Sequence, residues 1–377
     1  MKIYYIANAR MPNEKAHGIQ IAKMCEAFIT SGVDVTLVVP SRGSGNLKQF
    51  YGLAHEIPLR RLPVWNLQFL GPIGYRLTAF QFALSSLLYM WAKALLRERF
   101  IVYTIDMDSF SFAPLAWVPR PLCAEMHSTK RSIFLVRRFF KCAHIIATNR
   151  LIADGLAQTF GLPPERICVE PNGVDESVLQ NDISPHEARA KLNLPPTEPF
   201  ALYAGRFYKW KGLEILADAA ASSPLPIYLV GGTREEYEHV TKKSGEMLHF
   251  AGAKSADKVP LWLAAADVLL MLGTARNEYS YRYTSPMKIF EYLAADRPTV
   301  ASRTPAATSI MQENTAFWYE PDNAHSLAQT IHEAYTSPEA EVKIRAGRTL
   351  AAAHTWRRRA ERILAFCVSI EENTDNL

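Results

Sequence analysis

The sequence predicts two doubly wound α/β domains, each built on a parallel sheet covered by helices on both faces. Its 377 residues fit two domains of about 100 to 200 residues each. Short apolar runs alternate with helical-period stretches through the first 150 residues, and the same alternation restarts near residue 200. Between these series, residues 181–199 are polar and hold four prolines, which is typical of a linker. We therefore expect domains at 1–180 and 200–355.

The individual elements follow from this alternation. The predicted strands are 2–8, 33–39, 101–104, 122–126 and 144–148 in the first half, and 200–204, 226–230, 247–250, 268–271 and 298–302 in the second. A helix at 18–30 follows the first strand, and helices at 326–335, 338–353 and 355–370 close the chain. We expect the final segment, 356–377, to cross back and pack across the domain boundary. Because parallel sheets bind ligands at the carboxyl ends of their strands, the active site is expected in a cleft between the domains.

Composition narrows the class of protein. A content of 49% hydrophobic and 21% charged residues supports sizeable cores and argues against a disordered chain. The five cysteines are scattered and include no C-x-x-C pair, which argues against a disulfide framework or a zinc ribbon and favours a reducing cytoplasm. The start of the chain does not read as a signal segment. The longest uncharged run has 16 residues, between Arg76 and Lys93, and is short for a membrane-spanning helix.

Charge is distributed unevenly along the chain. Residues 1–150 hold 19 Lys and Arg against 8 Asp and Glu, whereas the remainder holds 23 against 29. The first half therefore suits an anionic partner, nucleic acid or a phospholipid surface, although solvated side chains on an ordinary surface would give the same count. Nucleic acid is disfavoured because no nucleic-acid motif accompanies the basic residues. Basic residues beside the apolar segments 80–91 and 133–136 suit a helix lying on an anionic bilayer, but 80–91 could equally be a fully buried helix.

Two glycine-containing strand ends in the second half are candidates for an anion site. Gly205 and Arg206 follow a strand, and Lys211 lies five residues further on. Two cations beside a helix start suit a diphosphate through charge pairing and free N–H groups, although such a pair is often only solvated. Gly231 ends the next strand, where a glycine lets the backbone approach a ligand or simply turn.

A third candidate is the helix start after residue 284. Ser285 is expected as its N-cap and Pro286 as its first helical residue. Lys288 and Glu291 then lie one turn apart on the same face. A carboxylate close to a phosphate-binding helix end would suit the two hydroxyls of a ribose, and the alternative is a Lys–Glu surface pair.

Together with the Pro-Asn-Gly-Val-Asp run at 171–175, these motifs resemble the family 4 glycosyltransferases over nearly the whole chain. The resemblance implies the GT-B fold, in which two Rossmann-like domains face each other across a cleft. It implies that Arg206 and Lys211 hold the diphosphate of a nucleotide sugar and that Glu291 accepts from the ribose hydroxyls. It also places His127 beside the transferred sugar. The remaining donor-site residues that it implies are Gly18, Gly205, Gly231, Gly252, Ala253, Lys254, Ser285, Pro286, Met287 and Lys288.

Two departures from the family pattern fall on the sugar side of this site. The family has a glutamate eight positions before Glu291, and this chain has Tyr283 there, with Glu278 five residues away. The loop at Gly18 has one glycine where the family usually has two. Both changes leave the nucleotide side intact, which fits altered sugar specificity.

The resemblance implies transfer of a sugar with retention at the anomeric carbon and without a metal cofactor. Asp106 and Asp108 have the spacing of a metal motif, but a capping role is favoured over a magnesium site. The expected acceptor is a glycan or a lipid-linked sugar of surface polysaccharide, lipopolysaccharide or capsule, reached by a cytoplasmic protein at the inner face of the membrane. Two alternatives stay open: an inactive GT-B scaffold, consistent with Tyr283, and a nucleotide-sugar epimerase.

Overall fold

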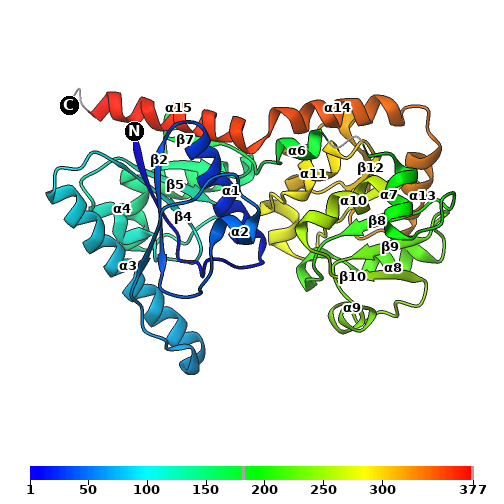
Figure 1. Cartoon of the computed structure of the whole chain (residues 1–377), viewed down its shortest axis with the longest axis horizontal. Coiled ribbons are helices and arrows are strands. Elements are labelled where there is room, and N and C mark those ends of the chain that lie inside the picture. The colour runs from blue at the N-terminus through cyan, green and yellow to red at the C-terminus, as the bar shows by residue number, and fades with distance from the viewer. Residues whose placement is uncertain (181–182, 375–377) are drawn as a thin grey trace. The chain divides into compact units, whose positions relative to one another are not determined.

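A computed structural model describes residues 1–180 and 183–374 and divides the chain into two compact units. The first unit comprises Met1–Asn172 together with the chain from Trp356 onward, and the second comprises Gly173–Thr355. In Figure 1 the first unit runs from blue to green and ends in the red helix, while the second runs from green to orange. Each unit is a parallel sheet with helices packed around it, so the predicted fold class is confirmed.

The first unit contains a seven-stranded sheet in the order β3-β2-β1-β4-β5-β6-β7. Its strands are β1 (Lys2–Ile6), β2 (Asp34–Pro40), β3 (Leu59–Leu62), β4 (Ile101–Ile105), β5 (Leu122–Met126), β6 (His144–Ala147) and β7 (Ile167–Val169). Every residue of β4 and β5 is buried, as expected for parallel strands that are covered on both faces. The strand order reverses at β1 and β4, because β2 and β3 are added on one side of β1 and the later strands on the other. Doubly wound folds bind ligands at such a point.

Helices enclose this sheet. They are α1 (Ala16–Thr30), α2 (Leu47–Tyr51), α3 (Gly71–Leu95), α4 (Phe134–Cys142), α5 (Arg150–Phe160) and α15 (Trp356–Thr374), with short 3₁₀ turns η1 (Gln68–Leu70), η2 (Ala113–Trp117) and η3 (Pro164–Arg166). Helix α5 shows why such segments begin and end where they do. Asn149 caps it by accepting from the Ile152 amide, and Gly161 ends it in the left-handed conformation, with φ of 66°. Helix α15 packs against α1.

The second unit contains a six-stranded sheet in the order β10-β9-β8-β11-β12-β13. Its strands are β8 (Ala201–Ala204), β9 (Ile227–Val230), β10 (Leu248–Gly252), β11 (Val268–Met271), β12 (Thr299–Ser302) and β13 (Phe317–Tyr319). Its helices are α6 (Glu176–Leu179), α7 (Pro185–Leu192), α8 (Glu214–Ala220), α9 (Arg234–Thr241), α10 (Val259–Ala265), α11 (Lys288–Ala294), α12 (Pro305–Thr308), α13 (Ala324–Thr336) and α14 (Ala340–Ala353). Shorter turns are η4 (Lys209–Lys211), η5 (Ala256–Lys258), η7 (Glu313–Thr315) and the π-helical turn η6 (Tyr279–Tyr283).

The segment around the expected linker belongs to the second unit. Val174 donates its amide to the carbonyl of His354, and Val178 and Leu179 pack against the second unit's core. Within 181–199, helix α7 forms behind a capping box at Ser184, and Arg189 reaches the carboxylate of Asp267 at 2.6 Å. Residues 181–182 of the expected linker lie outside the described residues.

One of the two interpretations of the segment 80–91, that it is a fully buried helix, is wrong. The side chains of Phe80 and Leu88 are 60% and 61% exposed, so the segment 80–91 is not a fully buried helix. Among residues 1–180 and 183–374, no helix has the length and apolar character needed to cross a bilayer. The long apolar helix therefore places one face on the sheet side and leaves large side chains on its other face.

Candidate functional site

Three glycines converge at the carboxyl ends of neighbouring strands in the second unit. Gly205 follows β8, Gly231 follows β9, and Gly252 ends β10. The Gly205 amide donates to Val230 at 2.7 Å, and the Gly231 amide donates to Gly252 at 3.0 Å. A Cβ atom on Gly231 would lie 2.2 Å from the Gly205 carbonyl oxygen, so no side chain fits there. The result is a closely packed backbone edge where parallel sheets bind ligands.

Lys211 lies beside this edge and is held by the loop that carries it. Its Nζ donates to the carbonyl of Arg206 at 2.9 Å and lies 4.9 Å from the centroid of the Tyr208 ring. Burial, together with the charge of Arg206, lowers the pKa of Lys211 to about 8. A bound anion would favour the charged form of this lysine, so the position suits a phosphate.

Lys288 brings a third cation to the same edge from α11. Its Nζ donates to the carbonyl of Ala204 at 2.8 Å and lies 4.3 Å from the centroid of the Tyr203 ring. A Cβ on Gly205 would lie 2.6 Å from that Nζ, so the glycine leaves room for the lysine. Burial and the charge of Lys211 hold the pKa of Lys288 well below its usual value. Lys288 is therefore directed at the end of β8, and the alternative of a Lys–Glu surface pair is wrong.

The start of α11 differs from the prediction. The helix begins at Lys288, without a side-chain cap, rather than at Pro286 behind a Ser285 cap. The Ile289 amide donates to Pro286 at 3.1 Å and the Phe290 amide donates to Met287 at 3.1 Å, so the first turn has three-residue spacing. Because these first bonds span three residues rather than four, the α-helical pattern begins two residues later than predicted.

Glu291 lies one turn into α11 and is half-buried. Burial raises the pKa of its carboxyl group, while the charge of Lys288 opposes that change. Its predicted role as acceptor for ribose hydroxyls remains a prediction. The π-helical turn before α11 ends at Tyr283, whose hydroxyl lies 3.5 Å from Glu278 Oε1. The tyrosine that replaces the family's glutamate therefore has a carboxylate beside it.

Three further predicted donor-site residues, Gly252, Ala253 and Lys254, border a hollow. Gly252 has φ of 75°, Ala253 is exposed, and the Lys254 Nζ lies 5.9 Å from the Trp262 ring centroid. A cavity of about 510 Å³ lies here, and its lining includes Lys254, Phe250 and Trp262. The segment thus has aromatic surface and a cation next to it.

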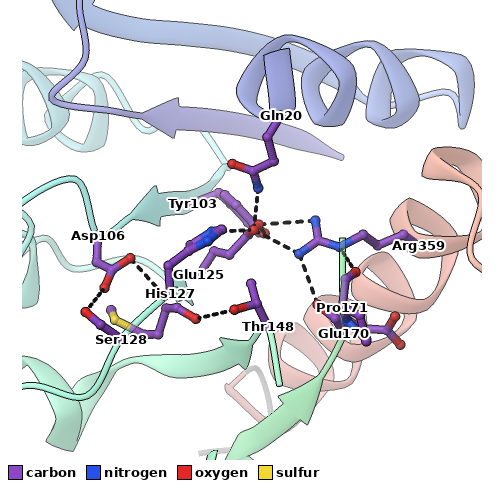
Figure 2. Close-up of polar contacts among 11 residues, drawn as sticks. Gln20, Tyr103, Asp106, Glu125, His127, Ser128, Thr148, Glu170, Pro171 and Arg359 are labelled. Atoms are coloured by element: carbon purple, nitrogen blue, oxygen red, sulfur yellow. Dashed lines mark hydrogen bonds and ion pairs between the residues drawn. The ribbon is translucent and has the colours of Figure 1, made fainter. Parts of the chain in front are cut away.

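In the first unit, His127 lies just after β5 and is fixed at both its backbone and its ring. Its amide donates to Asp106 Oδ1 at 2.9 Å, and its Nε2 lies 3.0 Å from Glu125 Oε1. Figure 2 shows the imidazole between these two carboxylates. The side chain is 27% exposed, whereas that of Glu125 is fully buried.

Glu125 is the centre of a hydrogen-bond network that the sequence analysis missed. Its Oε2 accepts from the Tyr103 hydroxyl at 2.6 Å, its Oε1 accepts from Arg359 at 2.8 Å, and Gln20 donates to Oε1 as well. Burial alone would raise the pKa of Glu125, but the charge of Arg359 and the bond from His127 hold it well below its usual range. The carboxylate is ionised and only accepts hydrogen bonds, so Nε2 of His127 carries a proton and donates it.

Arg359 belongs to α15 and is fully buried. Besides Glu125, its guanidinium donates to the carbonyls of Pro171 at 2.6 Å and Glu170 at 3.2 Å, as Figure 2 shows. The sequence did contain a signal for both partners. A carboxylate within an otherwise apolar strand needs a buried partner, and Arg359 lies on the same helical face as Trp356 and Ile363.

The two aspartates with metal-motif spacing are occupied by protein donors. Asp106 Oδ2 lies 2.6 Å from the Nζ of Lys130. Asp108 accepts from the backbone amides of Phe110 and Ser111 and from the side-chain amide of Asn8. Asp108 therefore closes a turn ahead of η2, but the N-cap of η2 is Phe112, so Asp108 does not cap that helix.

Gly18 has a packing requirement of its own. A Cβ there would lie 2.6 Å from the Tyr51 hydroxyl and 2.8 Å from the Asn13 carbonyl. Its neighbour His17 has a pKa lowered to about 4 by burial and by the nearby charges of Lys15 and His127. His17 is therefore neutral at pH 7 and lies near His127. Gly18 and His127 belong to the first unit, and the cation cluster belongs to the second.

Comparisons with known proteins agree with this arrangement. The family described as Glycosyltransferase Family 4 matches residues 18–178, and the family described as Glycosyl transferases group 1 matches residues 198–337. TuaC of Bacillus subtilis is 27% identical over 179 residues, covering 45% of this chain and 43% of that protein. A D-inositol 3-phosphate glycosyltransferase of Jonesia denitrificans is 25% identical over 244 residues, covering 59% and 56%. The chain thus spans about half the length of these relatives.

Solved structures show the same fold over the whole chain. HepE of Anabaena, solved in complex with UDP-glucose, superposes with a TM-score of 0.68 at 17% identity and 100% coverage of both chains. The fold and the strand-end site define a GT-B protein. The two family matches together cover 301 of the 377 residues, and the chain is a family 4-like glycosyltransferase with the GT-B fold.

Proposed function

We propose that the protein transfers a sugar from a nucleotide diphosphate sugar to a glycan or lipid-linked acceptor, with retention at the anomeric carbon. The observation that carries this proposal is the pair of lysines, Lys211 and Lys288, held beside Gly205, with the exposed Arg206 next in the chain. Both lysines have lowered pKa values because burial and neighbouring cations disfavour their charged forms. A diphosphate would relieve that repulsion, and HepE, which shares the fold, has been solved with UDP.

The chemistry that this cluster would assist is departure of the nucleotide. As the glycosidic bond breaks, negative charge collects on the leaving diphosphate, and fixed cations stabilise it electrostatically. In the first unit, Glu125 orients the His127 ring, which then presents its other nitrogen, Nδ1, for contact with the sugar. No step in this scheme requires a metal, and we expect turnover to persist in the presence of a chelator.

The proposed acceptor follows from the kind of relative that matches. TuaC is named for teichuronic acid biosynthesis, which supports a polysaccharide acceptor. A second candidate function is an inactive GT-B scaffold, and Tyr283 in place of the family's glutamate favours it. Measured turnover separates the two functions.

The test is nucleotide release from a panel of UDP-, GDP-, ADP- and dTDP-sugars, with the anomeric configuration of the product read by NMR. Lys211→Ala should lower turnover about 100-fold, the scale expected for loss of one preorganised electrostatic contact. Lys209→Ala is the matched control, because Lys209 is exposed on the same short turn. Equal turnover in the unchanged protein, Lys211→Ala and Lys209→Ala would contradict the diphosphate assignment. Nucleotide binding by the unchanged protein without turnover of any donor would favour the scaffold.

A further inference from the structure

Helix α3 carries an uninterrupted apolar stripe on its exposed side. The stripe comprises seven exposed side chains spaced by three or four residues: Ile73, Leu77, Phe80, Leu84, Leu88, Trp91 and Leu95. At 1.5 Å per residue it is about 33 Å long. Side chains three and four apart lie on one face of a helix, so the stripe is continuous. Soluble surfaces rarely expose apolar patches of this extent without a binding role.

The apolar surface continues onto elements that pack beside α3. Both α3 and α4 contact η2, and Figure 1 shows α3 and α4 on the same side of the first unit. Fifteen of the 23 large exposed hydrophobic side chains identified among the described residues lie between 65 and 134. They include Trp117 on η2 and Phe134 at the start of α4, and the three exposed tryptophans of the described chain, Trp65, Trp91 and Trp117, all lie here.

The charges around this surface have one sign. Seven cationic side chains between 71 and 141 are exposed: Arg76, Arg97, Arg99, Arg131, Arg137, Arg138 and Lys141. The four carboxylates in the same stretch are not exposed, and each has a partner in the structure. Arg138 lies 5.2 Å from the centroid of the Trp117 ring, so a cation and an exposed aromatic ring lie side by side on this face.

We propose that the face formed by α3, η2 and α4, here called the α3 face, docks onto the surface of an anionic lipid bilayer. Cations that flank an apolar helix attract acidic headgroups, while the apolar stripe enters the boundary between headgroups and acyl chains. Exposed tryptophans favour that boundary. A second copy of the chain fits the surface less well, because it would bring two cationic faces together without an exposed carboxylate between them.

The proposal is independent of glycosyl transfer, so its test uses binding alone. The full chain is sedimented with vesicles of phosphatidylcholine, and with vesicles that also contain 30% phosphatidylglycerol. We expect binding to the anionic vesicles, with weaker binding at high salt. Phe80→Glu and Leu88→Glu should each lower the partition coefficient about tenfold or more, because each replaces an apolar side chain that would enter the membrane with a charged one.

Matched controls come from α14 in the second unit. Val342→Glu places the same charge at a 55% exposed apolar site outside the α3 face and should bind like the unchanged protein. Arg99→Glu and Arg131→Glu should each lower binding to anionic vesicles about tenfold, whereas Arg345→Glu, an exposed position on α14, should not. Circular dichroism confirms that each variant folds.

Three outcomes would overturn the proposal. The first is absence of binding to either vesicle type by the unchanged, folded protein. The second is equal binding by Leu88→Glu and Val342→Glu. The third is a dimer in light scattering that Leu88→Glu converts to monomer while vesicle binding is absent, which would assign the α3 face to a second copy. Failure of any of these tests would leave the proposed transferase activity unaffected.

Discussion

Replacing Arg359 with methionine tests whether the C-terminal helix holds the Glu125 network in its ionised form. Methionine keeps much of the volume of arginine and removes its charge. In Arg359→Met, the carboxylate of Glu125 stays fully buried and keeps neutral donors such as the Tyr103 hydroxyl, but it loses its cation. The carbonyls of Pro171 and Glu170 lose their donor as well.

The magnitude follows from the burial of both partners. Breaking a buried ion pair by removing one side costs about 3–5 kcal/mol, because the remaining charge is uncompensated. In a cooperative unit of 150 to 250 residues, each kcal/mol lowers the melting temperature by about 2–4 °C, so the expected decrease is about 6–20 °C. Arg362→Met is the matched control on the same helix. Arg362 pairs with Glu170 at 2.7 Å, but its side chain is 39% exposed, and we expect a cost of about 1 kcal/mol.

The assay is urea unfolding of both variants between pH 4 and pH 8. In the unchanged protein the pKa of Glu125 is depressed, so its contribution to stability is present above the unfolded-state pKa of about 4.3 and is lost below it. In Arg359→Met, burial raises that pKa, and the penalty is relieved when the carboxyl is protonated. The stability difference should therefore narrow as the pH falls towards 4.

A second substitution, at Glu125, tests whether the cost of Arg359→Met comes from the uncompensated carboxylate. Glu125→Gln in the Arg359→Met background removes the uncompensated charge, so the double variant should lose less than the sum of the two single variants. A cost for Arg359→Met no larger than that for Arg362→Met, and unchanged with pH, would refute the assignment of an ionised Glu125 held by Arg359.

Three further predictions concern the second unit. Affinity for a nucleoside diphosphate, measured by calorimetry, should fall as the pH rises through about 8, because Lys211 loses its charge, and Lys211→Arg should weaken that dependence; an identical pH profile in the arginine variant would contradict this. Gly231→Ala should unfold at lower temperature than Gly252→Ala in thermal denaturation, since the added Cβ meets the Gly205 carbonyl at 2.2 Å in the first variant and nothing within 4 Å in the second. Turnover should be unchanged by EDTA in a nucleotide-release assay, and loss of activity restored by magnesium would show that the reaction needs a metal.

Strands with continuous apolar runs were predictable from the sequence, because alternation of short β-rich runs with helical-period stretches defines a parallel doubly wound sheet. The strands β3, β7 and β13 were not predicted. Strand β3 reads Leu-Arg-Arg-Leu and has no apolar run, whereas β7 and β13 are apolar but only three residues long, too short to be distinguished from a loop. Their pairing depends on neighbouring strands that sequence windows do not include.

The candidate site was predictable where its chemistry is local. Gly205, Arg206 and Lys211 lie in one loop, and their proximity follows from sequence spacing. The direction of Lys288 was not predictable, because it depends on where β8 ends relative to α11. The pairing of Glu125 with Arg359 joins residues 234 positions apart, and only the folded sheet brings them together.

The central claim is that the cations around Gly205 bind the diphosphate of a nucleotide sugar. Calorimetric titration with UDP, GDP, ADP and dTDP, and with the four matching nucleosides, tests it most directly. The account predicts selective binding of one diphosphate, little binding of its nucleoside, and a loss of about tenfold or more in affinity in Lys211→Ala but not in Lys209→Ala. Equal affinity for nucleoside and diphosphate, or an unchanged affinity in Lys211→Ala, would contradict it.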